Sequence, residues 1–253
     1  MTSPRRARTV AEASAPLEHY LIPVPQRGAD VCTVCHGSVY DGHPVCYPCA
    51  NARWVLGGLR LDAVTFVALA PAGGQLARDL YTYKRPNVPP HLRSTRTVGL
   101  AAVLWRCLAA HERCLAAAAG CGGFDLVATV PSTGGRTQPH PLATLVGNVV
   151  AGTAERVREV LMLNRTDLDQ RQPARDRFAV RSDVRGRDVL LIDDTWTTGA
   201  KMQSASAALK TAGARRVGGV AIGRWLTVDY RDNAAWLTAA QRCSWTWDTC
   251  CLE

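Results

Sequence analysis

Segments that could enter a membrane are missing from this sequence of 253 residues. The most apolar stretch, residues 100–119, is interrupted by Arg106 and by the polar run at 111–113. It therefore falls short of the roughly 20 apolar residues that a spanning helix needs. Residues 1–26 carry positive charge but lack the apolar centre of a secretory signal. We expect a soluble cytoplasmic protein that does not insert into a membrane.

Two common phosphate-binding signatures are also missing. The sequence has no G-x-x-x-x-G-K-[ST] loop and no G-x-G-x-x-G segment after an expected strand, which excludes a P-loop nucleotide hydrolase and a dinucleotide-binding fold. No internal repeat is present either. A phosphate-binding function would have to use another loop.

Aromatic residues are scarce, at 6%, and no dense basic run is present, although the net charge is +9. A groove that stacks single-stranded nucleic acid would need aromatic side chains between basic ones. The positive charge is explained by phosphate-rich substrates, by a nucleic-acid partner or by a solvated arginine-rich surface. Composition does not choose among these three.

The most informative stretch that is present runs from residue 188 to residue 200. Its apolar start, residues 189–192, predicts a strand buried on both faces of a parallel sheet, and Asp193 and Asp194 follow directly. A hydroxyl-rich turn then leads to a helix that begins near Gly199, whose N-terminus favours a phosphate. Two carboxylates beside an anion site suit ribose hydroxyls lying between them, with Mg²⁺ as a helper.

Further strands and helices alternate along the chain, which predicts an α/β fold: a parallel sheet with helices on both faces. The sequence favours strands at 63–70, 124–130, 157–163, 188–192 and 217–222. The helices expected between them lie at 74–84, 92–119, 142–151 and 200–212, and residues 165–181 are expected to form a long polar loop.

Four cysteines near the start form the pattern Cys32-x2-Cys35 and Cys46-x2-Cys49. Two such pairs can complete a tetrahedral thiolate site for a structural Zn²⁺ ion. A module of about 30 residues is too small to bury a core without a metal. His36 and His43 are expected to be bystanders, since four thiolates already complete the coordination shell.

The other cysteines are expected to be packing residues. Cys107, Cys114 and Cys121 recur every seven residues, which indicates one half-buried helix face. Cys243, Cys250 and Cys251 lie near Trp245 and Trp247, and packing, a second metal site and a redox site all remain open for them.

The stretch from Asp193 to Gly199 closely resembles the signature of type I phosphoribosyltransferases, which bind phosphoribosyl diphosphate (PRPP). That resemblance implies that Asp193 and Asp194 are the catalytic pair that meets the ribose hydroxyls. It also implies that the 5'-phosphate is bound by the turn residues Thr195, Trp196, Thr197, Thr198 and Gly199.

Together with the four-cysteine module, this signature resembles the ComF family, which is linked to DNA uptake by competent bacteria. The resemblance covers nearly the whole chain and includes the Lys/Tyr-rich segment 80–84, the strand 124–131 and the loop around 165–178. It implies a phosphoribosyltransferase of nucleoside metabolism that uses Mg²⁺ with PRPP and a nitrogenous base as acceptor. It also implies a DNA or competence-protein partner.

The chain departs from the ComF pattern after its second strand. Residues 132–138 replace the usual R-G-F-N-Q segment, and Lys201 stands where threonine is usual. By position, the replacement resembles the diphosphate-binding loop of type I phosphoribosyltransferases, with Thr133, Gly134, Gly135 and Arg136 as its binding residues. A lid over the diphosphate would use basic residues, for which the candidates are Lys84, Arg85, Arg165, Arg171, Arg175 and Arg177.

Two functions from different classes follow. The first is an enzyme, a phosphoribosyltransferase. The second is a non-catalytic PRPP- or nucleotide-sensing module that contacts DNA or a protein through its zinc module. The expected division is a disordered or extended tail at 1–28, the zinc module at 29–58, the phosphoribosyltransferase-like domain at 59–230 and a C-terminal helix with a Cys/Trp-rich tail at 231–253.

Overall fold

A four-stranded parallel sheet forms the centre of the protein. The computed structural model describes residues 9–133, 141–148 and 151–253. The sheet has the order β1–β6–β5–β2, and all of its paired strands run parallel. Its strands are β1 (Ala63–Pro71), β2 (Leu126–Thr129), β5 (Asp188–Trp196) and β6 (Arg216–Leu226).

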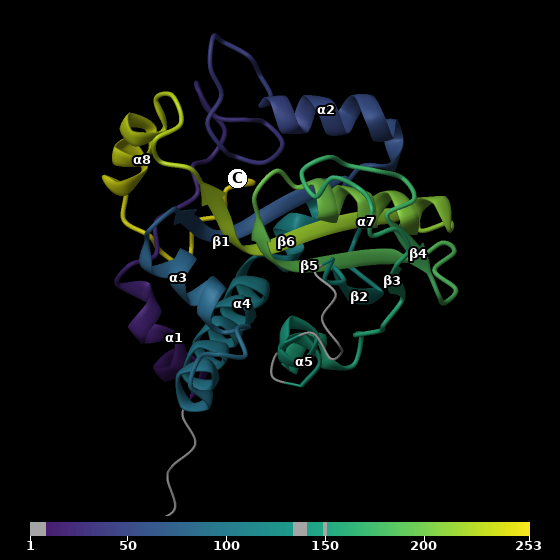
Figure 1. Cartoon of the computed structure of the whole chain (residues 1–253), viewed down its shortest axis with the longest axis horizontal. Coiled ribbons are helices and arrows are strands. Elements are labelled where there is room, and N and C mark those ends of the chain that lie inside the picture. The colour runs from purple at the N-terminus through teal and green to yellow at the C-terminus, as the bar shows by residue number, and fades with distance from the viewer. Residues whose placement is uncertain (1–8, 134–140, 149–150) are drawn as a thin grey trace, which may run out of the picture.

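The apolar run in β5 divides its side chains between two cores. Val189 and Leu191 are buried on the face that also buries α7 (Ala200–Thr211), whereas Leu190 and Ile192 are buried on the face covered by α4 (Pro90–Ala119). Because successive side chains of a strand point to opposite faces, a strand covered on both sides needs no polar alternation. Figure 1 shows α7 and α4 on opposite sides of the sheet.

Helices therefore cover both faces, and the predicted α/β class is confirmed. The α4 side also carries α1 (Val10–Glu18) and α3 (Gln75–Thr82), which both contact α4. The shorter α5 (Pro141–Asn148) and α6 (Ala151–Ala154) lie between α4 and the β2 edge. Among the described residues, no helix is long and apolar enough to span a bilayer.

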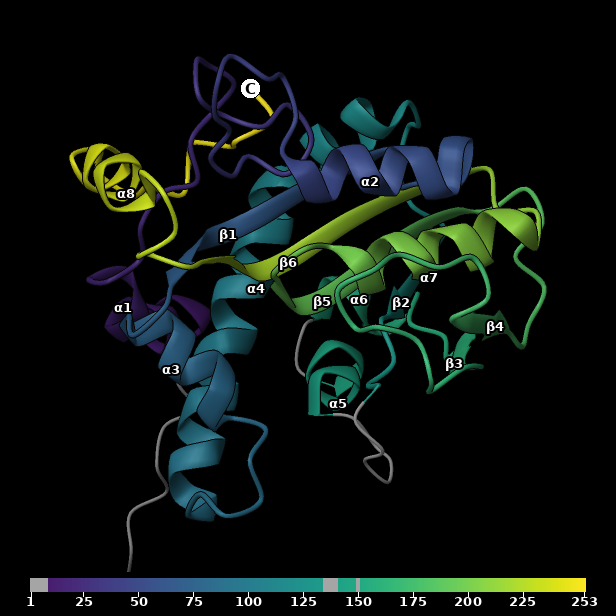
Figure 2. The same cartoon turned by 45° about the horizontal axis from the view of Figure 1, so that its top comes forward.

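The cysteine-rich module lies on the α7 side of the sheet. Its helix α2 (Tyr47–Leu56) and the 3-10 turn η1 (Gly57–Leu59) both contact α7. Figure 2 shows α2 above the strands, with the loops of the module beside it. The predicted order, a small Cys-rich module before a parallel-sheet domain, is confirmed, whereas the residue boundaries between domains stay a prediction.

Two segments differ from the sequence-based expectation. The strand expected at 157–163 is split: Val157 makes a single parallel bridge to Val127, and only β3 (Leu161–Leu163) is a regular strand. β3 pairs antiparallel with β4 (Phe178–Val180), which lies inside the expected loop. Strands of three residues bury too little apolar surface to leave a clear pattern in the sequence.

The two ends of the described chain also contain helices. Residues 10–18 form α1 instead of the expected disordered or extended tail, and Thr9 with Glu12 makes a reciprocal capping box at its start. Near the C-terminus, α8 (Asn233–Gln241) precedes an irregular tail. This tail lies against β1, where Trp245 Nε1 donates to the carbonyl of Val67 at 2.9 Å.

Candidate functional site

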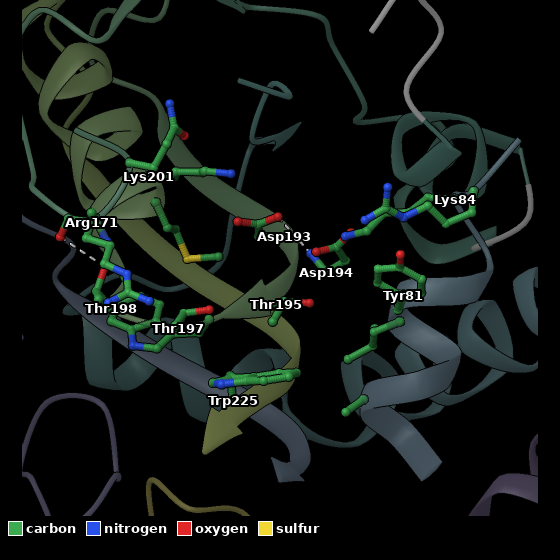
Figure 3. Close-up of a pocket in the computed structure, with 18 residues that line it drawn as sticks. Tyr81, Lys84, Arg171, Asp193, Asp194, Thr195, Thr197, Thr198, Lys201 and Trp225 are labelled. Atoms are coloured by element: carbon green, nitrogen blue, oxygen red, sulfur yellow. Dashed lines mark hydrogen bonds and ion pairs between the residues drawn. The ribbon is translucent and has the colours of Figure 1, made fainter. Parts of the chain in front are cut away.

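A cavity of about 520 Å³ opens where β5 ends and α7 begins. β5 continues to Trp196, four residues beyond the end expected from the apolar run, so Asp193 and Asp194 belong to the strand itself. The cavity is lined from four directions, by the end of α3, the loop that follows residue 169, the turn into α7 and the last part of β6 (Figure 3). Its main polar lining residues are Lys84, Arg85, Gln170, Arg171, Asp193, Asp194, Thr195, Thr197, Thr198 and Lys201.

Asp194 is buried and already has two close partners. Its Oδ2 accepts hydrogen bonds from Tyr83 Oη and from Lys84 Nζ, each at 2.6 Å. Burial acts to raise the pKa of Asp194, but the charge and hydrogen bond of Lys84, with the Tyr83 hydroxyl, outweigh it and hold this pKa below its ordinary value. Asp194 is therefore ionised and tied to the end of α3.

Asp193 lies in a different environment, although it is the adjacent residue. Its side chain is half-buried, and its Oδ1 accepts from the backbone N–H of Asp194 at 2.8 Å. Burial, followed by repulsion from Asp194, raises the pKa of Asp193 to about 7, and the positive charge of Lys201 opposes the rise. Figure 3 shows Asp193 in the cavity between Asp194 and Lys201. This carboxyl group is available to a ligand.

The turn between β5 and α7 is shaped by an indole ring below it. Trp196 is buried and packs edge-to-face on Phe66, with ring centroids 5.7 Å apart. Gly199 has φ of +78°, and a Cβ there would lie 2.1 Å from the Trp196 ring. Position 199 therefore requires glycine for two reasons: its backbone is left-handed, and a Cβ would clash with the indole ring. Because its ring lies in the core, Trp196 could bind a ligand only through its backbone.

The start of α7 supplies the features of an anion site. The first N–H groups of a helix have no partner within the helix, and their dipoles favour a negative charge. Lys201 lines the same cavity. The Thr198 hydroxyl accepts from the N–H of Ala200 at 3.3 Å and donates to the Arg171 carbonyl at 3.2 Å. An anion at the helix end and a hydroxyl donor at Asp193 can thus be bound side by side.

The expected diphosphate loop is only partly described. Thr133 is hydrogen-bonded to Gln170, a cavity residue, so this end of the loop reaches the cavity. Gly134, Gly135 and Arg136 lie outside the described residues. Their assignment to the diphosphate stays a prediction.

The six candidate lid residues occupy different places. Lys84 lines the cavity, whereas Arg165 pairs with Asp167 and Asp176, and Arg175 donates to the carbonyl of Val55 at 3.3 Å. The last candidate, Arg177, is fully buried, and its guanidinium donates to two carbonyls of its own loop, those of Asp169 and Gln172. None of these three arginines lines the cavity, whereas the other two candidates, Arg85 and Arg171, do.

Two residues of the site were not among the predicted binding residues. Tyr83 binds Asp194 from 111 positions away, although it belongs to the Lys/Tyr-rich segment 80–84. Trp225 lines the cavity from the end of β6, where the sequence is typical of an ordinary buried strand. Only the folding of α3 and β6 around β5 brings these side chains to the aspartates.

The four cysteines of the cysteine-rich module come together as predicted. The sulfur atoms of Cys32, Cys35, Cys46 and Cys49 all lie within 4.8 Å of one another, and those of Cys35 and Cys46 are 3.5 Å apart. Thiolates at about 2.3 Å from one ion in a tetrahedron are about 3.8 Å apart. This cluster could therefore hold a metal such as zinc. His36 is buried and bonds the Pro25 carbonyl instead.

Arg224 connects this cysteine cluster to the cavity. The buried guanidinium of this β6 residue contacts the Cys35 carbonyl at 3.0 Å and the Cys35 sulfur at 3.2 Å. It also donates to the carbonyl of Thr197, in the turn before α7, at 3.3 Å. Hydrogen bonding from Cys32 lowers the pKa of Cys35 well below its ordinary value, and the charge of Arg224 adds to this effect. A Cβ at Gly37 would meet the same guanidinium at 2.1 Å.

No family model matches this chain, and no curated protein matches it. Six chains of solved structures do match. One is the crystal structure of a phosphoribosyltransferase from Corynebacterium diphtheriae, which is 24% identical, with a TM-score of 0.28. The match covers 65% of this chain and 88% of the other. The likeness is too loose to place residues, so the assignment of the site depends on its own geometry.

Proposed function

We propose that this protein is a phosphoribosyltransferase of the ComF type, which binds PRPP with Mg²⁺ and transfers the 5-phosphoribosyl group to a nitrogenous base. The observation that carries the proposal is the position of Asp193 beside the N-terminus of α7 in one cavity of about 520 Å³. A hydroxyl-binding carboxylate next to an anion-binding helix end suits a sugar phosphate.

Each part of PRPP would have its own binding groups. The ribose hydroxyls would donate to Asp193, while Asp194, held by Tyr83 and Lys84, fixes the position of its neighbour. The 5'-phosphate would accept from the turn Thr195–Gly199 and the first N–H groups of α7, with Lys201 as its counter-charge. The diphosphate would lie towards Arg171 and the loop that begins at Thr133.

In the transfer, the bond from ribose C1' to the diphosphate oxygen breaks, and the diphosphate leaves with the electron pair. A nitrogen of the acceptor base would then bond to C1' and pass its proton to the departing diphosphate. The chain's contribution would be electrostatic: the arginines and lysine around the cavity balance the charge of the leaving group. Arg171 and Lys84 flank the cavity from different elements and could close over it.

Mg²⁺ would supply charge to the diphosphate. This ion prefers substrate phosphates, water and one or two carboxylates, and Asp193 offers such a carboxylate within the cavity. Among the described residues, no histidine or cysteine lines this cavity, so its donors suit a hard oxygen-preferring ion.

Titration calorimetry of the full chain with PRPP, with and without Mg²⁺, tests the proposal. We expect Mg²⁺-dependent binding that is lost in Asp193→Asn and in the Asp193→Asn/Asp194→Asn double variant. Asp183→Asn is the matched control, because Asp183 is an exposed acid that pairs with the neighbouring Arg185, away from the cavity. Binding that survives in the double variant, or its absence from the unaltered protein, would refute the assignment.

A second candidate is a non-catalytic sensor of PRPP or a nucleotide, with DNA or a protein as its partner. The contact of Arg224 with both Cys35 and Thr197 favours it, because ligand binding at the turn could reach the cysteine module through one side chain. Release of diphosphate with a panel of bases separates the two. Turnover with any base supports the enzyme, whereas tight binding without turnover supports the sensor.

A further inference from the structure

A second cluster of metal-binding side chains lies on the other side of the sheet from the Cys32–Cys49 module. His111 and Cys114 are three residues apart on α4, so they lie on one face of this helix. Cys250 of the C-terminal tail faces them. A ring nitrogen of His111 and the sulfurs of Cys114 and Cys250 all lie within 4.8 Å of one another.

The hydrogen bonds of His111 prepare it for a metal. Its Nε2 lies 2.8 Å from the carbonyl oxygen of Trp247, which can only accept. Nε2 therefore carries a proton, and in the neutral imidazole this leaves a free lone pair on Nδ1. The residue is only 9% exposed, and within the described structure Nδ1 is buried without a hydrogen-bond partner. Metal-binding histidines commonly donate their other nitrogen to a carbonyl in this way.

The three side chains leave a fourth coordination position, and one carboxylate lies near Cys114. The carboxylate of Glu253 lies 3.4 Å from the Cys114 sulfur, where it could take a fourth position. The hydroxyl of Thr65, on β1, lies 3.8 Å from the Cys250 sulfur and could donate to a thiolate. Two thiolates, one imidazole and one oxygen form a typical tetrahedral set for zinc.

Neither simple thiol packing nor a disulfide satisfies the imidazole of His111. Packing of the thiols against the helix gives the buried Nδ1 of His111 nothing to bind. A disulfide between Cys114 and Cys250 would leave the same nitrogen unpaired and would require an oxidant. A metal ion accounts for the lone pair of His111 and for both sulfurs together.

We propose that His111, Cys114 and Cys250 bind a second zinc ion, with Glu253 or water at the fourth position, and that this ion fastens the C-terminal tail to α4. The tail needs such a fastening because residues 242–253 form no regular helix or strand. Its anchored position covers the outer edge of β1, where Trp245 bonds Val67. This inference does not depend on the proposed function.

Native mass spectrometry and metal analysis of the purified full chain test the proposal. We expect two zinc ions per chain, falling to one in Cys114→Ser and in Cys250→Ser. Cys121→Ser is the matched control and should keep both ions, since Cys121 lies beyond the end of α4 and bonds the Ala116 carbonyl. Cys114 is partly exposed, so its replacement should leave the fold intact, as far-UV circular dichroism would verify.

A second measurement uses the unaltered protein and so tests the proposal even if the variants fail to fold. In the unaltered protein, chelation should speed the alkylation of Cys114, because a metal-bound thiolate reacts slowly. One zinc per chain, two zinc ions in Cys114→Ser, or alkylation that chelation does not change would overturn the proposal. So would a mass lower by two hydrogens with Cys114 and Cys250 joined as a disulfide.

Discussion

At the scale of single residues, two adjacent aspartates perform different tasks because their partners differ. Asp194 is paired with Lys84 and Tyr83 and is ionised. Asp193 accepts from a backbone N–H and lies beside its neighbour's negative charge, so burial and repulsion raise its pKa to about 7. One aspartate thus stabilises the folded site, whereas the other is held at a cost in stability that a ligand can offset.

The first prediction follows from the raised pKa of Asp193. At pH values between the ordinary pKa of an aspartate and about 7, the folded state binds more protons than the unfolded state. The contribution of Asp193 to the free energy of unfolding therefore falls as the pH rises through that range. Asp193→Asn cannot titrate. We expect it to match the unfolding temperature of the unaltered protein only near or below pH 4, and its advantage in unfolding temperature to grow by roughly 2–6 °C between pH 5 and pH 8. Thermal unfolding across this range measures the effect, and parallel curves would contradict it.

Asp194→Asn should destabilise the folded protein, whereas Asp193→Asn stabilises it at the same pH. The substitution removes the negative charge beside Lys84 Nζ and leaves a partly buried ammonium group with a weaker partner. Breaking one side of such a pair destabilises by about 2–4 kcal/mol. Urea unfolding at pH 7 measures this loss, and Asp193→Asn serves as the matched variant at the adjacent position. Equal effects of the two variants would show that the difference in environment has no energetic consequence.

At the scale of elements, the unit formed by β5, the turn and α7 determines the shape of the proposed phosphate site. The buried indole of Trp196 supports the turn from below, and Gly199 passes directly over it. The helix can begin at Ala200 only because residue 199 adopts a left-handed conformation without a side chain. The position of the first N–H groups of α7 therefore depends on a contact in the hydrophobic core.

Gly199→Ala should both destabilise the protein and weaken phosphate binding. Strain at φ of +78° and the clash with Trp196 should together cost about 2–5 kcal/mol. Gly186→Ala is the control, because Gly186 also has positive φ, +69°, but has open space around its Cβ position. We expect about 1–2 kcal/mol for the control and normal ligand binding. Urea unfolding and calorimetry with PRPP compare them; equal losses would exclude a role for the Trp196 contact.

At the scale of the whole molecule, the cysteine module and the cavity share one buried side chain. Arg224 contacts Cys35 of the module and Thr197 of the turn, although these residues are 162 positions apart in the sequence. The cysteine module is therefore joined to the parallel-sheet domain at the turn before α7. It supports the turn that shapes one wall of the cavity.

Arg224→Lys tests this connection. Lysine keeps the positive charge but has a single nitrogen, so it cannot reach Cys35 and Thr197 together. We expect unchanged zinc content at the four-cysteine site and PRPP binding weaker by about tenfold, or about 1.4 kcal/mol. Arg216→Lys, at the exposed start of the same strand, is the control. Calorimetry and metal analysis give both readings, and unaltered PRPP affinity would argue against support of the turn by the module.

Much of the fold could be predicted from the sequence because its signals are local. The apolar run before Asp193 and the paired C-x2-C motifs each lie within a short segment, and the structure places them as a buried strand and a sulfur cluster. The β3–β4 pair was missed, since three-residue strands in a polar segment carry no pattern. The cluster at His111 was missed because the seven-residue cysteine spacing on α4 also describes an ordinary helix face.

Side chains close together in the chain settle which segments become buried strands, where the acidic pair stands and how four thiols can meet one ion. Three contacts depend instead on the packing of distant elements: Lys84 and Tyr83 neutralise Asp194 but not Asp193, Arg224 connects the cysteine module to the turn, and Cys250 meets His111. Charges and hydrogen bonds act through space, so the electrostatics of the site depended on how distant elements pack around β5.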